Sequence, residues 1–162
     1  MPHYNVLFLC TGNSARSIMA EAIMRHRGGE HFSVFSAGSQ PSGFVRPEAI
    51  SQIEKAGMSA EGLRSKSWEE FSKPDSPHLH FIFTVCDSAA NEVCPLWPGK
   101  PMTAHWGVPD PAAVKGTPEE IERAFGQAFA TLDHRIRLFL SLPVDTLGSF
   151  AIQQEIDTIG KS

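Results

Sequence analysis

The stretch Asn5-Val-Leu-Phe-Leu-Cys10-Thr-Gly-Asn-Ser-Ala-Arg16-Ser17 joins a continuous apolar run to the start of an amphipathic segment. The run Asn5–Leu9 is typical of a strand that is buried on both faces of a sheet. The segment Ser14–Arg27 predicts a helix, because its apolar residues share one face and basic residues fill its last turn. A buried strand followed directly by a helix is the starting unit of an α/β fold with parallel strands.

The same alternation of strand and helix continues along the chain. The apolar runs predict three more strands and three more helices: strands at Phe32–Phe35, Leu79–Val85 and Met102–Ala104, and helices at Pro47–Ala56, from Pro118 onward and at Thr146–Ile159. The helix from Pro118 has the clearest start, because Thr117 and Glu120 can form a capping box. We therefore expect a parallel sheet with helices on both faces, with ligands bound at the carboxyl ends of its strands.

Composition narrows the class of protein. The chain has 162 residues, 41% of them hydrophobic and 20% charged, which indicates one globular domain. Fourteen basic against eighteen acidic residues give a net charge of −4, which argues against a nucleic-acid partner. No apolar run reaches the roughly 18 residues of a membrane span, and no signal peptide is visible. We expect a cytoplasmic protein with a catalytic domain over residues 1–142, extended by a helical segment over residues 143–162.

The loop after the first strand has the features of an oxyanion site. Cys10 and Arg16 are separated by five residues, and such a loop directs backbone N–H groups to one point at the positive end of a helix. Gly12 would relieve the steric cost of the curl, and Arg16 can hold two oxygens of a tetrahedral anion. The same field favours a thiolate at Cys10, to which Ser17 can donate a hydrogen bond. The expected anion-binding residues are Thr11, Gly12, Asn13, Ser14, Ala15 and Arg16.

The remaining cysteines and one aspartate fall at informative places. Three cysteines are too few for a disulfide scaffold, so catalytic, metal-binding and inert roles stay open for them. Cys86 follows the third predicted strand, and Asp110 follows the fourth. Because parallel strands end at one edge of a sheet, we expect both residues to lie near Cys10.

The opening stretch resembles the low-molecular-weight protein tyrosine phosphatase superfamily, and more narrowly the arsenate reductases built on that fold. Further motifs match the same branch: Ser36-Ala37-Gly38, Cys86 with Cys94-Pro95, His105-Trp106-Gly107, and Asp110-Pro111. The resemblance spans about residues 5 to 140. It implies a three-layer, flavodoxin-like α/β fold with a four-stranded parallel sheet in the order 2-1-3-4.

The resemblance also implies roles for the site residues. Cys10 would attack arsenic, Arg16 and the loop amides would hold the oxyanion, and Asp110 would protonate the departing oxygen. Cys86 would then attack Cys10, and Cys94 would attack Cys86. The resulting disulfide would be reduced by an external thiol reductant, either thioredoxin or glutaredoxin with glutathione, with no tightly bound cofactor. Arsenate would be the substrate, with phosphate and sulfate as its mimics.

Some relatives bind potassium beside this loop through an Asn, a Glu, a Ser and an Asp. Asn13, Glu21 and Ser36 match the first three ligands, whereas Ser65 or Lys66 stands at the fourth. A lysine ammonium there would replace the ion. We therefore expect no bound metal, and we interpret the three matching residues as a remnant of a cation site.

Two alternatives remain open. The first is a phosphatase of the same fold, acting on phosphotyrosine or small phosphoesters; it has no use for Cys86 and Cys94. The second is a non-enzymatic module that binds As(III) or zinc through three thiols, with His105 as an extra ligand. Cys86 and Cys94 are eight residues apart, unlike the close Cys-x2–4-Cys pairs of common zinc sites, and such a module does not need Arg16.

Overall fold

A four-stranded parallel sheet forms the centre of the protein in a computed structural model that describes residues 3–86, 97 and 99–162. The strand order is β2-β1-β3-β4. The strands are β1 Tyr4–Leu9, β2 Phe32–Ala37, β3 Phe81–Thr84 and β4 Met102–His105. The expected number, direction and order of the strands are confirmed.

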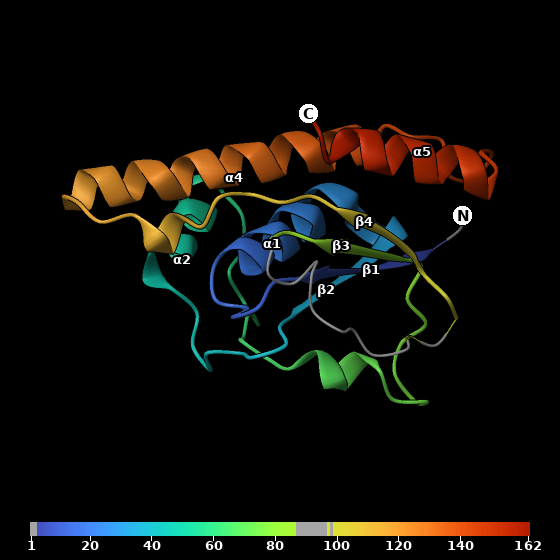
Figure 1. The fold of residues 1–162 in the computed structure, drawn as a ribbon, viewed down its shortest axis with the longest axis horizontal. Helices are drawn as coiled ribbons and strands as arrows, with labels where there is room; N and C mark the ends of the chain where they lie inside the picture. Colours follow the sequence, from blue (N-terminus) through green and yellow to red (C-terminus); the bar gives the residue numbers. More distant parts are fainter. Residues whose placement is uncertain (1–2, 87–96, 98) are drawn as a thin grey trace.

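Within the described ranges, four α-helices lie on one face of this sheet (Figure 1): α1 Arg16–Gly28, α2 Pro47–Lys55, α4 Pro118–Leu140 and α5 Ser149–Ile159. Their buried apolar side chains share one core cluster with Val6 and Phe8 of β1. The alternate residues Leu7 and Leu9 point to the opposite face. Among the described residues, that face is covered by the short 3₁₀ helix η2, Trp68–Phe71, and by Trp97. Strand β1 is therefore buried on both sides, as its apolar run predicts.

Several element boundaries differ from those expected. Helix α1 begins at Arg16 rather than Ser14, because the carbonyl of Ser14 accepts the backbone N–H of Arg46 and keeps the chain in a loop. Helix α5 begins at Ser149 rather than Thr146, because residues 143–147 form a turn closed by two backbone hydrogen bonds to the carbonyl of Pro143. The predicted capping box of Thr117 and Glu120 at the start of α4 is present.

The C-terminal segment contributes to the same core. Ile152, Ile156 and Ile159 of α5 are buried in the cluster that also holds Trp106 and Phe139. No helix among the described residues is both long and apolar enough to span a bilayer.

Candidate active site

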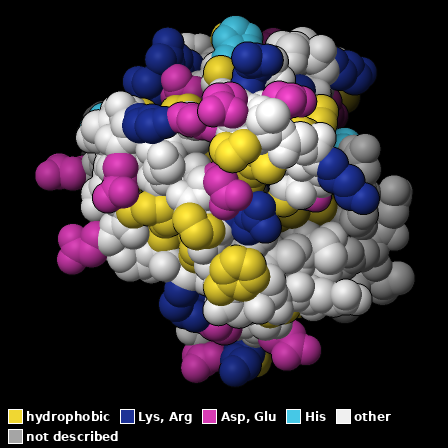
Figure 2. All heavy atoms as spheres, turned by 90° about the vertical axis from the view of Figure 1, so that its left-hand side faces the viewer, with side chains coloured by type: hydrophobic (Ala, Val, Ile, Leu, Met, Phe, Trp, Pro, Cys, Tyr) yellow, Lys and Arg dark blue, Asp and Glu magenta, His cyan; other side chains and the backbone are white. Residues whose placement is uncertain are grey.

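A cleft of about 460 Å³ opens at the carboxyl ends of β1 and β3. Its lining comes from the loop after β1, the end of β3 and the loop after β4: Cys10, Thr11, Gly12, Ser14, Ala15, Arg16, Cys86, Val108, Pro109, Asp110 and Ala112. Figure 2 views this end of the molecule and shows hydrophobic side chains gathered beside basic and acidic ones at its centre. The sheet thus brings together most of the predicted site residues from three separate parts of the sequence.

The loop between β1 and α1 is held from behind by residues 37–46. The backbone N–H groups of Gln40 and Ser42 donate to the carbonyls of Thr11 and Gly12, at 3.0 Å each. These bonds direct the loop carbonyls away from the cleft. The N–H of Thr11 donates into the cleft, to the sulfur of Cys86 at 3.3 Å. A loop with this polarity offers N–H groups to an anion.

Asn13 supports the loop from beneath and does not line the cleft. Its side chain is fully buried, donates to Ser17 Oγ and Ser36 Oγ at 2.7 and 3.0 Å, and accepts the backbone N–H of Lys66 at 2.9 Å. Its φ of 45° lies in the left-handed region, which Asn tolerates better than most residues. The strained position of the curl is therefore Asn13, not Gly12 as expected.

Gly38 sets the tightest steric limit on the loop. A Cβ atom there would lie 2.4 Å from the carbonyl oxygen of Thr11 and 2.6 Å from that of Cys10. At Gly12, by contrast, a Cβ would only make an ordinary contact of 3.7 Å with Ser14 Oγ. The physical reason for the glycine of the Ser36-Ala37-Gly38 motif, which the sequence indicates only by resemblance, is this close approach of two backbones.

Cys10 and Cys86 are both buried free thiols, and both line the cleft. The hydrogen bond to Cys86 and burial raise the pKa of Cys10, while the charge of Arg16 and the N–H of Gly12 act to lower it. The expectation of an acidic Cys10 is therefore wrong for this arrangement. Two interacting thiols lose their protons in coupled steps. The backbone N–H of Thr11 donates to the sulfur of Cys86.

Arg16 joins two sides of the cleft. Its Nη1 donates to the carbonyl of Val108 at 3.0 Å, and its Nη2 lies 3.6 Å from Oδ2 of Asp110. Asp110 also accepts the N–H of Ala112 at 2.9 Å, at the start of the 3₁₀ helix η3, Pro111–Ala113. The Asp110 side chain is 43% exposed and the Arg16 side chain 14% exposed, so the carboxyl group stands at the mouth and the guanidinium lies deeper. Sequence reasoning did not indicate the carbonyl of Val108 as a partner of Arg16.

Ser17 is placed differently from the expectation. It is fully buried, and its Oγ accepts a hydrogen bond from Asn13 at 2.7 Å. Among the described residues, no hydrogen bond joins Ser17 to the sulfur of Cys10. Cys94 lies outside the described residues. His105 contacts Thr84 Oγ1 through Nδ1 at 2.8 Å and does not line the cleft.

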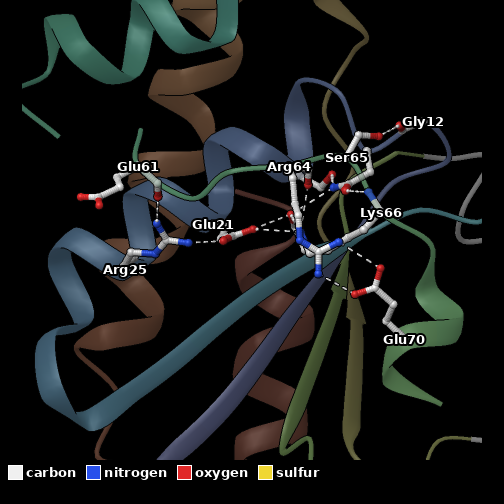
Figure 3. A network of polar contacts seen from close by, with 11 residues as sticks. Gly12, Glu21, Arg25, Glu61, Arg64, Ser65, Lys66 and Glu70 are labelled. Atoms are coloured by element: carbon white, nitrogen blue, oxygen red, sulfur yellow. Dashed lines mark hydrogen bonds and ion pairs between the residues drawn. The ribbon is translucent and has the colours of Figure 1, made fainter. Parts of the chain in front are cut away.

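Glu21 and Ser36, two of the three expected cation-site residues, lie beside the ammonium group of Lys66. Figure 3 shows Glu21 and Lys66 in this network of polar contacts. Nζ of Lys66 lies 3.6 Å from Oε1 of Glu21, 3.4 Å from Ser36 Oγ and 3.0 Å from the carbonyl of Arg64. Burial is the main cause that lowers the pKa of Lys66, and the charge of Glu21 opposes it. Glu21 is itself buried, accepts from Ser36 at 2.6 Å and pairs with Arg25. Of the two residues that could stand at the fourth ligand position, Lys66 and not Ser65 lies beside the Glu21 carboxylate, and its ammonium group supplies the positive charge there.

The family is decided by a comparison of the whole sequence. Residues 5–148 match the family model described as low molecular weight phosphotyrosine protein phosphatase. The chain belongs to this family. Within the low-molecular-weight phosphatase family, a curated relative from Bacillus licheniformis named arsenate reductase is 34% identical over 140 residues, which cover 86% of this chain and 96% of the relative. The expected resemblance to the arsenate reductase branch is confirmed.

Solved structures agree with this placement in the phosphatase family. One described as an arsenate reductase in the oxidized state superposes with a TM-score of 0.69 at 25% identity, covering 85% of this chain and 96% of its own. The tyrosine phosphatase Wzb from Escherichia coli K30, solved in complex with sulphate, gives a TM-score of 0.67 at 21% identity, with coverage of 85% and 96%. The second likeness shows the fold alone.

Proposed function

We propose that this chain is a thiol-dependent arsenate reductase. The observation that supports this best is the presence of two buried free thiols, Cys10 and Cys86, in one cleft that also holds Arg16 and Asp110. A phosphoester hydrolase needs one nucleophilic sulfur, since water resolves its intermediate. Reduction of As(V) to As(III) needs two electrons, and two neighbouring thiols supply them together when they are oxidised to a disulfide.

In the first step, the loop amides and Arg16 hold arsenate, and Cys86 leaves the N–H of Thr11 to make room. The thiolate of Cys10 attacks arsenic, so that a sulfur–arsenic bond forms and an arsenic–oxygen bond breaks. The departing oxygen leaves as water after Asp110 gives up its proton.

In the second step, the thiolate of Cys86 attacks the sulfur of Cys10. A disulfide forms, the sulfur–arsenic bond breaks, and its electron pair stays on arsenic, which leaves as arsenite. Cys94 then attacks Cys86 and frees Cys10. An external thiol system, thioredoxin or glutaredoxin with glutathione, reduces the last disulfide, and no tightly bound cofactor takes part. The relay suits a reducing, cytoplasmic location and a role in arsenic detoxification.

An arsenate turnover assay, run in parallel with purified thioredoxin and glutaredoxin systems, tests the proposal. Cys86→Ser and Cys94→Ser should each stop multiple turnover with arsenate and leave the hydrolysis of a phosphate ester largely intact. Hydrolysis without any arsenate-dependent use of reductant, in the unaltered protein, would contradict the reductase assignment.

A low-molecular-weight phosphatase is the second candidate. The position of Asp110 favours it, because a partly exposed carboxyl at the mouth of the cleft can protonate an ester's leaving group. Arsenate and phosphate have nearly the same shape, so we expect some ester hydrolysis beside arsenate reduction. The metalloid-binding alternative has less support, since such a module does not need Arg16, whose side chain lines the cleft beside Cys10 and Cys86.

A further inference from the structure

Helix α5 lies beyond the matched family region, which ends at residue 148, yet it contacts the loop that carries Asp110. The indole N–H of Trp106 donates to the carbonyl of Ile156 at 2.9 Å. Trp106 is fully buried and stacks on Phe83, with ring centroids 3.8 Å apart. The indole therefore cannot move away without leaving both the core and its acceptor on α5.

The end of α5 approaches the same loop at its backbone. A Cβ atom on Gly160 would lie 2.3 Å from the carbonyl oxygen of His105 and 3.0 Å from Cδ1 of Trp106. Such distances cannot be relieved by the rotation of a side chain, because the nearest atom belongs to the backbone. Gly160 thus lets the last turn of α5 sit directly on the chain that leaves β4.

Arg135 of α4 ties these parts together. Its Nη1 donates to the carbonyl of Gly107 at 3.0 Å, and its Nη2 donates to the carbonyl of Ser162 at 3.2 Å. The residue is 7% exposed, and burial lowers its pKa. One buried guanidinium therefore bridges the loop after β4 and the segment that follows α5.

The next residues of the loop belong to the active site. Val108 donates its N–H to the carbonyl of Val85 at 3.0 Å and accepts from Arg16 at 3.0 Å, two residues before Asp110. We propose that α5 and Arg135 are positioning elements for the proton donor: by fixing Trp106 and Gly107, they set where Val108 and Asp110 stand relative to Arg16. This proposal rests on the proposed function, in which Asp110 protonates the departing oxygen.

Gly160→Ala is the direct test, and Gly148→Ala is its matched control. Both glycines flank α5, but a Cβ at Gly148 would meet nothing within 4 Å. Hydrogen exchange gives a readout that does not depend on activity. Gly160→Ala should speed exchange at Val108 and through η3, whereas Gly148→Ala should leave exchange there unchanged. Unchanged exchange in folded Gly160→Ala would overturn the coupling.

The catalytic readout compares two aryl phosphates. For an ester with a poor leaving group, Gly160→Ala should lower kcat by about tenfold, because small displacements of a catalytic group are costly. An ester with a good leaving group needs no proton, so its kcat should change little. In an Asp110→Asn background, Gly160→Ala should add almost nothing, since both changes remove the same proton transfer. Equal losses for both esters would indicate a merely structural role and overturn the proposal.

Arg135→Lys repeats the test if Gly160→Ala does not fold, with the exposed Arg137→Lys on the same helix as its control. Lysine keeps the charge but cannot bridge two carbonyls with a planar fork, so the same leaving-group dependence is expected. Full kcat for the poor leaving group in folded Arg135→Lys would count against the proposal. Absence of both activities in the unaltered protein would refute the proposed function instead, and the exchange measurement would still decide whether α5 holds the loop.

Discussion

Cys10 and Cys86 have to be considered as one titrating unit. The pKa of Cys10 is raised first by the hydrogen bond to Cys86 and then by burial. Opposing these causes are the charge of Arg16 and the N–H of Gly12. Arg16 and the loop N–H therefore do favour a thiolate at Cys10, but the interaction with Cys86 opposes its formation.

Removal of the Cys86 sulfur should show how far Arg16 and the loop N–H lower the pKa of Cys10. We expect Cys86→Ala to lower the pKa of Cys10, because the largest cause of its elevation is lost while Arg16 stays in place. Ultraviolet absorbance of the thiolate against pH, together with the rate of alkylation, measures the change. Cys94→Ala is the comparison variant. A titration of Cys10 that stays unchanged or moves upward in Cys86→Ala would show that burial alone controls it.

Lys66 and Glu21 form the second charged pair of the site region, and both are buried. Removal of Lys66 leaves Glu21 paired with Arg25 but takes away a buried charge partner, and it also removes a hydrogen-bond partner of Ser36. We expect Lys66→Met to lower the free energy of unfolding by about 1 to 3 kcal/mol, the range for buried polar groups that lose a hydrogen-bond partner. The exposed Lys73→Met should change it by less than about 0.5 kcal/mol. Urea unfolding of the two variants makes the comparison.

A salt comparison separates the lysine from a metal ion at this place. Potassium chloride and sodium chloride at equal ionic strength should give the unaltered protein the same Tm, because Nζ of Lys66 already contacts Glu21 and Ser36. A rise in Tm specific to potassium would show that an ion binds beside the ammonium group.

At the scale of elements, the loop after β1 depends on the end of β2. Gly38 follows β2, accepts the N–H of Trp68 at 2.9 Å and approaches two carbonyls of the loop. Gly38→Ala should push the loop outward, cost about 1 to 3 kcal/mol of stability as overpacking does, and weaken binding of inorganic phosphate. Gly126→Ala on α4 is the control, since a Cβ there makes only ordinary contacts. Calorimetric titration with phosphate compares the two, and equal affinities would contradict this account.

Local patterns predicted the elements well, and distant contacts explain the errors. The start of α4 was predictable because Thr117 and Glu120 satisfy each other within one turn. The start of α1 was not, because Ser14 is held by Arg46, thirty-two residues away. The anion loop and its partners Cys86 and Asp110 followed from topology. The side-chain details, such as the inward turn of Asn13, depend on Lys66 and Ser36 and have no local signal.

Arg135 is a buried charge whose position in α4 is visible in the sequence pattern. It lies three residues after Leu132 and four before Phe139, within the buried stripe of α4. A charged residue at such a position must find polar partners in the interior. Its partners, the carbonyls of Gly107 and Ser162, come from the loop after β4 and the C-terminal segment, and only the fold identifies them.

At the scale of the whole molecule, His80 links β1 to the residue that precedes β3, and its titration should make the stability of the fold depend on pH. The N–H of Asn5 donates to Nδ1 of His80 at 2.9 Å, which requires a neutral ring. Burial, and then the nearby His78 and His3, lower the pKa of His80 from 6.5. Just below pH 6.5 the unfolded chain therefore binds more protons than the folded one, so stability falls as pH drops from 6.5 through the lower folded-state pKa.

Thermal unfolding followed from about pH 8 to about pH 5 measures this loss across the ordinary titration range of histidine. His80→Gln keeps an acceptor without the titration and should flatten the profile over that range. The exposed His26→Gln should leave the profile as it is in the unaltered protein. An identical slope in all three proteins would assign the pH dependence to other groups.

Helix α5 also covers the outer side of β4, which is an edge strand of the sheet. The N–H groups of Met102 and Trp106 pair inward with β3, so the carbonyls of Thr103 and His105 point outward. Gln153 donates to the first at 2.9 Å, and Gly160 covers the second. The outer side of β4 is thus closed to a further strand. A chain without α5 would present a bare strand beside an apolar surface, which is a template for self-association between copies.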